Sequence, residues 1–345
     1  MTDQMWFDET HAGLTKLCAD NVFDVFDIVI QNYRIRIYTQ KETGFSRFRR
    51  AFSTNQNPDL NIKPSLSLFC IDSKYIDALP LPPWKKKTFD SFGNAIGLGD
   101  QYHVRVNVES NQLQTIDISR GMALFYAENS YEMPSWEYFS PLKELLHFWC
   151  LSKALVLLHS AVIVDDVFGA SLLLGKGGAG KSTTTIQAMD LNYQSCGDDY
   201  VIVSPSAMSV MPLYCIVKWQ VSSKFVRPHY LDDCFEEWDD RTQKQVFFLN
   251  DDAGHSSTPK ALEQILILDR TARYHPKSVS FHEALIQCTL STITQVPVAA
   301  EKTFCLLHRL IQSCPPLSYG VGDGQEALID ALSKLRQFNR KECMA

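Results

Sequence analysis

The residues best suited to chemistry form one run, Gly175 to Ser182, which reads GKGGAGKS. The run matches the phosphate-loop pattern GxxxxGK(S/T) without a mismatch, with apolar residues Leu172 to Leu174 before it and a predicted helix from Lys181 after it. Glycines let successive backbone amides point into one concavity, and the start of a helix adds positive potential. We therefore expect this loop to bind the phosphates of ATP.

Two side chains of the loop have separate expected roles. Lys181 should reach the β- and γ-phosphates, and the hydroxyl of Ser182 should bind Mg²⁺. The residues expected to contact the nucleotide are Gly175, Lys176, Gly177, Gly178, Ala179, Gly180, Lys181, Ser182 and Thr183.

An acidic pair, Asp198 and Asp199, follows the loop after a span long enough for one helix and a return connection. We expect the pair at the start of the next strand, where adjacent side chains point to opposite faces. One carboxylate would accept the proton of an attacking hydroxyl and the other would orient the metal or its water. Ser182, Asp198 and Asp199 are the predicted metal ligands, and a solvated turn with an acidic cap is the alternative for the pair.

Three further positions are candidates. His159 precedes the hairpin that leads into the loop, so it could lie close to the γ-phosphate, although alone it is better explained as a structural histidine. Asp269 ends the run ILILD, which has the form of a Walker B strand, and is the second choice of metal partner. Asp165 and Asp166 are expected to cap the hairpin turn.

The elements that must position these residues alternate between strand and helix, which indicates an α/β core. The expected strands are 160–164, 171–174, 200–203 and 265–268, and the expected helices start at 181 and span 301–313 and 325–338. Earlier in the chain the pattern is strand-like, with alternation in 32–38 and 104–108 and a turn into 113–118.

A domain boundary is predicted near residue 140. Ser140 and Pro141 suit the start of a helix, and the stretch to Leu157 should form an amphipathic helix that packs on the next domain. We therefore expect a mainly β domain over 1–139, for substrate recognition or assembly, and a P-loop domain over 140–345.

Composition excludes several classes of partner. The net charge is −6 and the sequence pI is about 5.9, so no field favours nucleic acid. No apolar stretch approaches the roughly 20 residues that span a bilayer, and the first residues lack the features of a signal peptide. We expect a cytoplasmic protein without a membrane partner. The 10 cysteines form no CxxC pair, which argues against a zinc site.

The stretch 159–203 resembles the catalytic domain of bacterial HPr kinase/phosphorylase and its relatives, the HPr-kinase-like proteins of peptide-modification clusters. In that family a histidine precedes a hairpin and a phosphate loop, and an aspartate pair follows. The resemblance implies a serine kinase in which Asp199 accepts the hydroxyl proton and His159 assists near the transferring phosphoryl group. Oligomers are common in that family, so a homo-oligomer is a further expectation.

The chain also departs from that family. HPr kinase proper has a metal-binding glutamate in a downstream signature, whereas Leu213 to Trp219 offers Lys218 and no carboxylate. The resemblance therefore does not extend to a second metal or to the reverse, phosphate-dependent reaction. Lys218 either points into the site, where it would neutralise phosphate charge, or lies at the surface. Residues 1–139 do not look like the N-terminal domain of HPr kinase.

We therefore expect a kinase that uses ATP and Mg²⁺ to phosphorylate a hydroxyl, most naturally a serine of a peptide or small protein. Two alternatives remain open. One is a small-molecule kinase with the same site. The other is a nucleotide-dependent switch or scaffold that hydrolyses ATP slowly, with ILILD as its Walker B strand.

Overall fold

The computed structural model describes residues 1–52, 59–85, 88–220, 225–250, 253–269, 276–322 and 324–342. The chain forms two compact units, Met1–Arg50 with Gln56–Ser152, and Ala51–Asn55 with Lys153–Ala345. Both contain sheets and helices, so the fold is mixed α/β, as expected. Among the described residues, no helix combines the length and the apolar character needed to cross a membrane.

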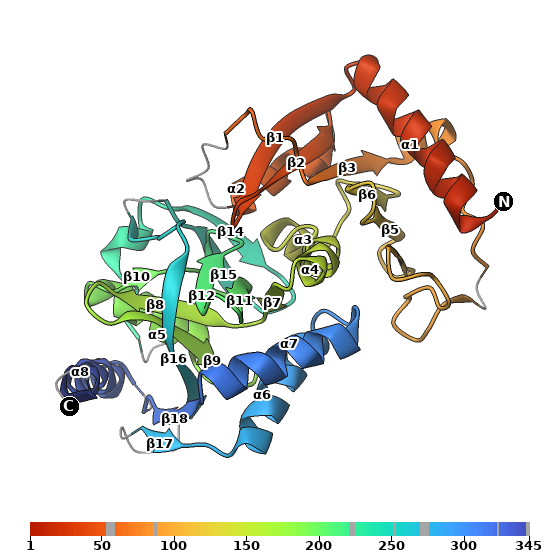
Figure 1. Ribbon diagram of the computed structural model, residues 1–345. Coiled ribbons are helices and arrows are strands. Elements are labelled where there is room, and N and C mark those ends of the chain that lie inside the picture. Colours follow the sequence, from red (N-terminus) through yellow and green to blue (C-terminus); the bar gives the residue numbers. More distant parts are fainter. Residues whose placement is uncertain are drawn as a thin grey trace. The chain divides into compact units, whose positions relative to one another are not determined.

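The first unit is built on one six-stranded sheet with the strand order β1-β2-β3-β6-β5-β4 (Figure 1). β2, β3 and β6 run parallel, and the other neighbours are antiparallel. The strands are β1 (Phe23–Ile30), β2 (Tyr33–Gln40), β3 (Leu66–Asp72), β4 (Tyr102–Asn107), β5 (Gln112–Asp117) and β6 (Met122–Ala127). The predicted strands 32–38, 104–108 and 113–118 coincide with β2, β4 and β5.

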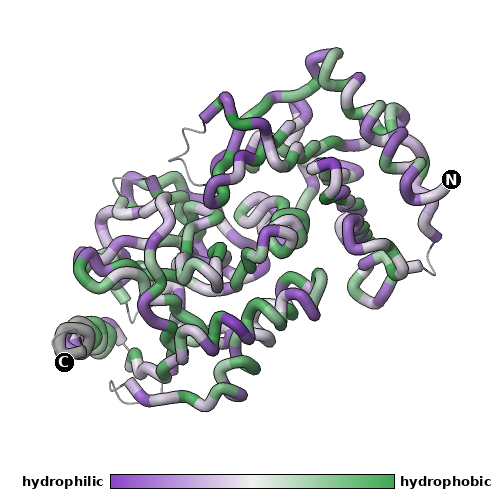
Figure 2. The backbone as a smooth tube through the Cα atoms, viewed as in Figure 1, coloured by the Kyte–Doolittle hydropathy of each residue, from purple (hydrophilic) through white to green (hydrophobic). Residues whose placement is uncertain are grey.

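Helices accompany this sheet. They are α1 (Asp3–Ala19), α2 (Phe48–Ala51), α3 (Ser135–Phe139) and α4 (Lys143–Ser152), with the 3₁₀ turns η1 (Gly44–Arg47) and η2 (Ser73–Ala78). Helix α1 lies within a region expected to be strand-like. Its side chains Trp6, Phe7 and Leu14 are buried at helical spacing, and the Thr2 hydroxyl caps its first turn by accepting from the Met5 amide. Hydrophobic and hydrophilic residues alternate along it (Figure 2).

The helix expected over 141–157 is shorter and packs differently. Leu142 has a φ of 63°, so α4 begins after it, and the chain has returned to a strand by Val156. α4 is tied to the sheet of the first unit, because the His103 and Phe148 rings stack at 4.8 Å and Arg105 pairs with Glu144 at 2.7 Å. The division between the units therefore follows Ser152, later than the predicted boundary near 140.

The second unit contains a nine-stranded sheet and a three-stranded sheet. In the larger one, seven strands follow the order β10-β8-β9-β16-β12-β11-β7, with β18 beside β16 and β17 beside β18. Its strands are β7 (Val156–Leu158), β8 (Ala161–Asp165), β9 (Gly169–Leu174), β10 (Gln194–Ser195), β11 (Val201–Ser204), β12 (Ser209–Pro212), β16 (Lys260–Asp269), β17 (Lys277–Ser278) and β18 (Leu317–Gly320).

The three-stranded sheet has the order β13-β15-β14. Its strands are β13 (Ile216–Trp219), β14 (Phe235–Asp239) and β15 (Lys244–Phe248), and the helices of the unit are α5 (Lys181–Asp190), α6 (Phe281–Ile293), α7 (Ala300–Ser313), α8 (Gln325–Glu342) and η4 (His229–Leu231). Helices α6 and α7 pack side by side (Figure 1). The strands and helices expected in this unit are confirmed, and α6 is an addition to them.

Two segments of the second unit, 156–165 and 194–204, form strand pairs with each other at two places. β8 pairs with β10 so that Val164 lies opposite Gln194, and β7 pairs with β11 so that Leu158 lies opposite Val201. The two registers differ by one residue. β7 leads into β8 through residues 159 and 160, and β10 leads into β11 through residues 196–200. The extra residue therefore lies in 196–200, the stretch opposite residues 159–162.

Candidate functional site

The loop Gly175 to Gly180 joins β9 to α5, which is the strand–loop–helix order expected from the sequence. Gly175, Gly178 and Gly180 have φ values of 146°, 81° and 103°, which side-chain-bearing residues rarely adopt. A Cβ on Gly175 would lie 2.7 Å from the Cβ of Ala179. The tight loop therefore requires glycine and brings its amides to the start of α5.

Lys181 is the first residue of α5, and its side chain folds back over the loop. Its Nζ donates a hydrogen bond to the carbonyl oxygen of Gly175 at 2.8 Å, and the residue is 8% exposed. Burial lowers the pKa of this amine, and the carboxylates of Asp198 and Asp199 act in the opposite direction. The loop therefore carries a buried amine that lies close enough to two carboxylates for their charge to raise its pKa.

Ser182 and Asp198 are brought together, as the predicted metal site requires. The Ser182 hydroxyl donates to Asp198 Oδ1 at 3.1 Å, and the Lys218 amide donates to Oδ2 at 3.2 Å. Burial, followed by the charge of Asp199, raises the pKa of Asp198. A bound cation would stabilise the ionised form of Asp198 and so offset the cost of burying its charge.

The donor set of this pair fits magnesium. Mg²⁺ prefers oxygen ligands and is commonly held by one or two carboxylates together with substrate phosphates. A hydroxyl and one carboxylate oxygen meet that requirement. Among the described residues, no group of three or more His, Cys, Asp or Glu side chains could hold a metal ion, so the protein's share of the ligands would be small.

Asp199 faces a different set of partners from Asp198. Its Oδ1 lies 3.3 Å from His159 Nε2, and its Oδ2 accepts from Lys218 Nζ at 2.8 Å. Burial raises the pKa of this carboxyl, but Lys218 and then His159 outweigh burial and hold it well below its usual range. Asp199 is thus an ionised carboxylate between two basic side chains.

The backbone explains why the two aspartates diverge. Asp198 and Asp199 precede β11 rather than lying within it, and Asp199 has a φ of 79°. This left-handed conformation costs energy for a non-glycine residue, and such strain clusters at functional sites. Asp199 lies within 196–200, the stretch in which the strand pairing changes register by one residue.

His159 is held on both sides of its ring. Its Nδ1 lies 3.2 Å from the carbonyl oxygen of Ser291, near the end of α6, and its ring centroid lies 5.4 Å from that of Tyr200. The carbonyl of Ser291 can only accept, so Nδ1 carries a proton. No pattern in the residues around His159 predicts a contact with α6.

Lys218 lies on β13 of the three-stranded sheet and points into the site, which is one of the two placements expected for it. Its Nζ also lies 3.8 Å from Oδ2 of Asp239, a residue at the end of β14 that is 0% exposed. Sequence reasoning missed Asp239, because it stands in the acidic run DDCFEEWDD, which has the composition of a solvated turn.

The remaining acidic candidates have other positions relative to the loop and its hydroxyl. Asp165 Oδ1 accepts from the Val167 amide at 2.9 Å, so it caps the β8–β9 turn as expected, and Asp166 is exposed. Asp269 ends β16, the parallel neighbour of β9, where Ile267 lies opposite Leu174. The carboxylate that contacts Ser182 is that of Asp198.

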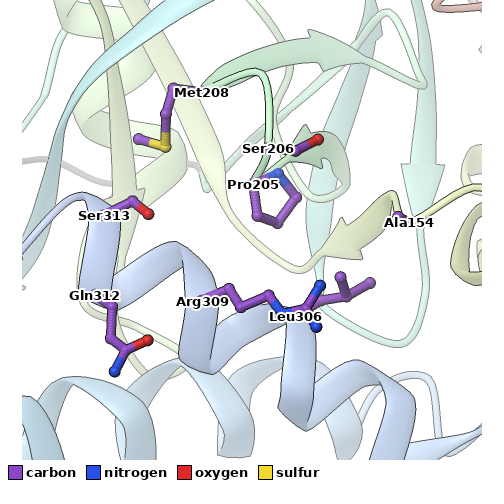
Figure 3. Close-up of a pocket in the computed structure, with 8 residues that line it drawn as sticks. All are labelled: Ala154, Pro205, Ser206, Met208, Leu306, Arg309, Gln312 and Ser313. Atoms are coloured by element: carbon purple, nitrogen blue, oxygen red, sulfur yellow. The ribbon is translucent and has the colours of Figure 1, made fainter.

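A separate pocket of about 320 Å³ lies at the other end of β7 and β11 (Figure 3). Pro205, Ser206 and Met208 of the β11–β12 turn line it, together with Leu306 and Arg309 of α7. None of the predicted site residues lines this pocket, so it is not part of the cluster around Asp199.

No protein-family model and no curated protein sequence matches this chain. The geometry of the loop, the aspartate pair and the basic side chains around it is therefore the basis for a proposed function.

Proposed function

We propose that this protein is a kinase that transfers the γ-phosphoryl group of ATP to a hydroxyl, with a serine of a peptide or small protein as the acceptor. One observation carries the proposal. Adjacent aspartates face different partners, Asp198 the hydroxyl of Ser182 and Asp199 the side chains of His159 and Lys218. A place for a metal and a place for a proton acceptor thus lie side by side at the start of α5.

The loop and Lys181 would hold the nucleotide. The start of α5 offers amides without partners in the helix, and phosphate oxygens are suitable acceptors for them. The Lys181 ammonium would exchange the Gly175 carbonyl for the β- and γ-phosphate oxygens. Mg²⁺, held by Ser182 and Asp198, would neutralise charge on those oxygens.

Asp199 would accept the proton of the acceptor hydroxyl. Its lowered pKa keeps it ionised, though it also makes the carboxylate a weak base. Weak basicity matters little here, because phosphoryl transfer passes through a loose transition state in which alignment and charge stabilisation dominate. Asp199 would chiefly orient the hydroxyl and take up its proton once the new bond forms.

Lys218 would supply positive charge beside Asp199, and the His159 ring would lie on the other side of the same carboxylate. The equatorial oxygens of the transferring group carry the charge of the transition state, and fixed cations in a buried site stabilise it. The side chains of His159 and Lys218 are 19% and 12% exposed. They are thus sheltered from water but still accessible to a substrate.

A nucleotide-dependent switch is the competing proposal, and the position of Asp269 favours it. This residue ends the parallel strand beside β9, where a Walker B aspartate would lie. The switch predicts slow release of free phosphate and no labelled acceptor. A small-molecule kinase would use the same residues as the peptide kinase and differ only in the acceptor.

The deciding experiment is incubation of the protein with γ-labelled ATP, Mg²⁺ and pools of serine-containing peptides and small hydroxyl compounds. Label on a peptide serine, lost in Asp199→Asn but kept in the exposed-turn control Asp166→Asn, supports the proposal. The variant should still bind MgATP in calorimetry. Label found only as free phosphate would support the switch. Label on a small hydroxyl compound would show that the acceptor is a small molecule rather than a peptide.

A further inference from the structure

We infer that Asp239 is a positioning residue that holds the Lys218 ammonium at Asp199. The kinetic consequence of this inference rests on the proposed function. The placement itself rests on contacts of the described residues, so it can be tested without substrate.

The three-stranded sheet places the two side chains on the same face. Lys218 on β13 lies opposite Val246 on β15, and Asp239 on β14 lies opposite Lys244, two residues earlier on β15. Residues two apart on a strand share a face, so Lys218, Lys244 and Asp239 project from the same side. Lys218 Nζ is 2.8 Å from Asp199 Oδ2 and 3.8 Å from Asp239 Oδ2.

The other carboxylate oxygen of Asp239, Oδ1, is held by backbone amides of the following turn. Oδ1 accepts from the amides of Arg241 and Thr242 at 3.1 and 3.4 Å, at the turn between β14 and β15. Oδ2 has no hydrogen-bond partner among the described residues. A fully buried carboxylate requires a counter-ion, and Lys218 is the cation paired with it.

The two carboxylates therefore share one ammonium, and this arrangement has a use. A lysine has a flexible four-carbon stem, and with Asp199 as its sole partner it would be free to leave when substrate arrives. Asp239, anchored by two backbone amides, keeps the ammonium in the site while Asp199 turns to the acceptor hydroxyl. Lys218 would then be in place for the phosphoryl oxygens.

A double-mutant cycle tests whether Asp239 acts through Lys218. Asp239→Asn preserves an oxygen for the turn amides and removes the charge. We expect kcat to fall by roughly 10- to 100-fold with little change in KM for ATP, because a small misplacement of a catalytic group has effects of that size. In a Lys218→Met background the same change should have no further effect. Multiplied losses would overturn the inference.

Thermal unfolding supplies a second cycle that needs no activity. Lys218→Met leaves the Asp239 charge buried without its cation and should lower Tm by roughly 5 °C, and adding Asp239→Asn should recover part of that loss. The exposed neighbour Asp240→Asn is the matched control and should recover nothing. If wild type shows no turnover, the proposed function has failed, and the Tm cycle alone decides. Strictly additive Tm shifts would then refute the role of Asp239.

Discussion

His159 Nε2 lies 3.3 Å from Asp199 Oδ1, and both residues belong to the stretches in which two paired segments of the chain change register by one residue. Forty residues of sequence separate the two side chains, and the β-hairpin, the glycine-rich loop and α5 lie between them. Asp199 has a left-handed backbone in this stretch, and its carboxylate contacts His159 and Lys218. The proposed site thus depends on backbone conformation and tertiary contacts as well as on residue type.

Replacing Lys181 should abolish nucleotide turnover. Lys181→Ala removes the ammonium that folds over the loop, and with it the cation expected on the β- and γ-phosphates. Calorimetry should show MgATP affinity falling by at least about 10-fold, the scale of one lost charge-assisted hydrogen bond. Lys277→Ala, on the exposed strand β17, is the control. Unchanged turnover in Lys181→Ala would remove the loop from the site.

Replacing Ser182 should act on magnesium rather than on the acceptor. Ser182→Ala removes the hydroxyl that contacts Asp198 at 3.1 Å, while the rest of the loop is kept. The magnesium concentration for half-maximal activity should rise by roughly 10- to 100-fold, and KM for the acceptor should stay constant. Ser206→Ala, in the distant pocket, should leave both values at the wild-type level. An equal rise in both constants in Ser182→Ala would contradict a metal role.

Loss of activity at acidic pH should depend on Lys218. Asp199 has a lowered pKa, so it stays ionised as pH falls through the range where ordinary aspartates take up protons. Lys218→Met removes the largest lowering influence, so the pKa of Asp199 rises and the variant should lose activity at a higher pH than wild type. Initial rates between pH 4 and 8 measure this, because protonation of Asp199 in wild type falls below that range. A variant whose profile has the same shape as that of wild type would show that Asp199 does not control activity at acidic pH.

Stability should fall as pH drops from about 6.5 to 4. Burial lowers the pKa values of His103 and His147 to about 4, and the unfolded chain has the ordinary value near 6.5. Below 6.5 the unfolded state therefore binds more protons, and each histidine loses about 3 kcal/mol of its contribution by pH 4. Urea unfolding at several pH values should show this slope, reduced in His103→Gln and retained in the exposed control His11→Gln.

Local patterns were sufficient for the loop and the elements on either side of it. In the run Gly175 to Ser182, the glycines predict the tight loop and the residues that follow predict the helix. Both predictions succeed because these structures depend on neighbours within a few positions. The cap by Asp165 and the strand ending at Asp269 were predictable for the same reason. Helix α1 was predictable from the capping residue Thr2 and from the helical spacing of its apolar residues. It was missed because strand-like alternation dominates the pattern of the residues that follow it.

What only the tertiary structure decided is which distant residues meet at Asp199. Lys218, Asp239 and the Ser291 carbonyl arrive from β13, β14 and α6, and strand pairing and helix packing with distant parts of the chain set their positions. The residue types and the hydrophobic periodicity along the chain carry no information about such pairings. The sequence by itself determined a phosphate-type loop and an aspartate pair. The division of that pair between a hydroxyl and two basic side chains depends on the backbone conformation of Asp199 and on contacts with parts of the chain that are distant in sequence.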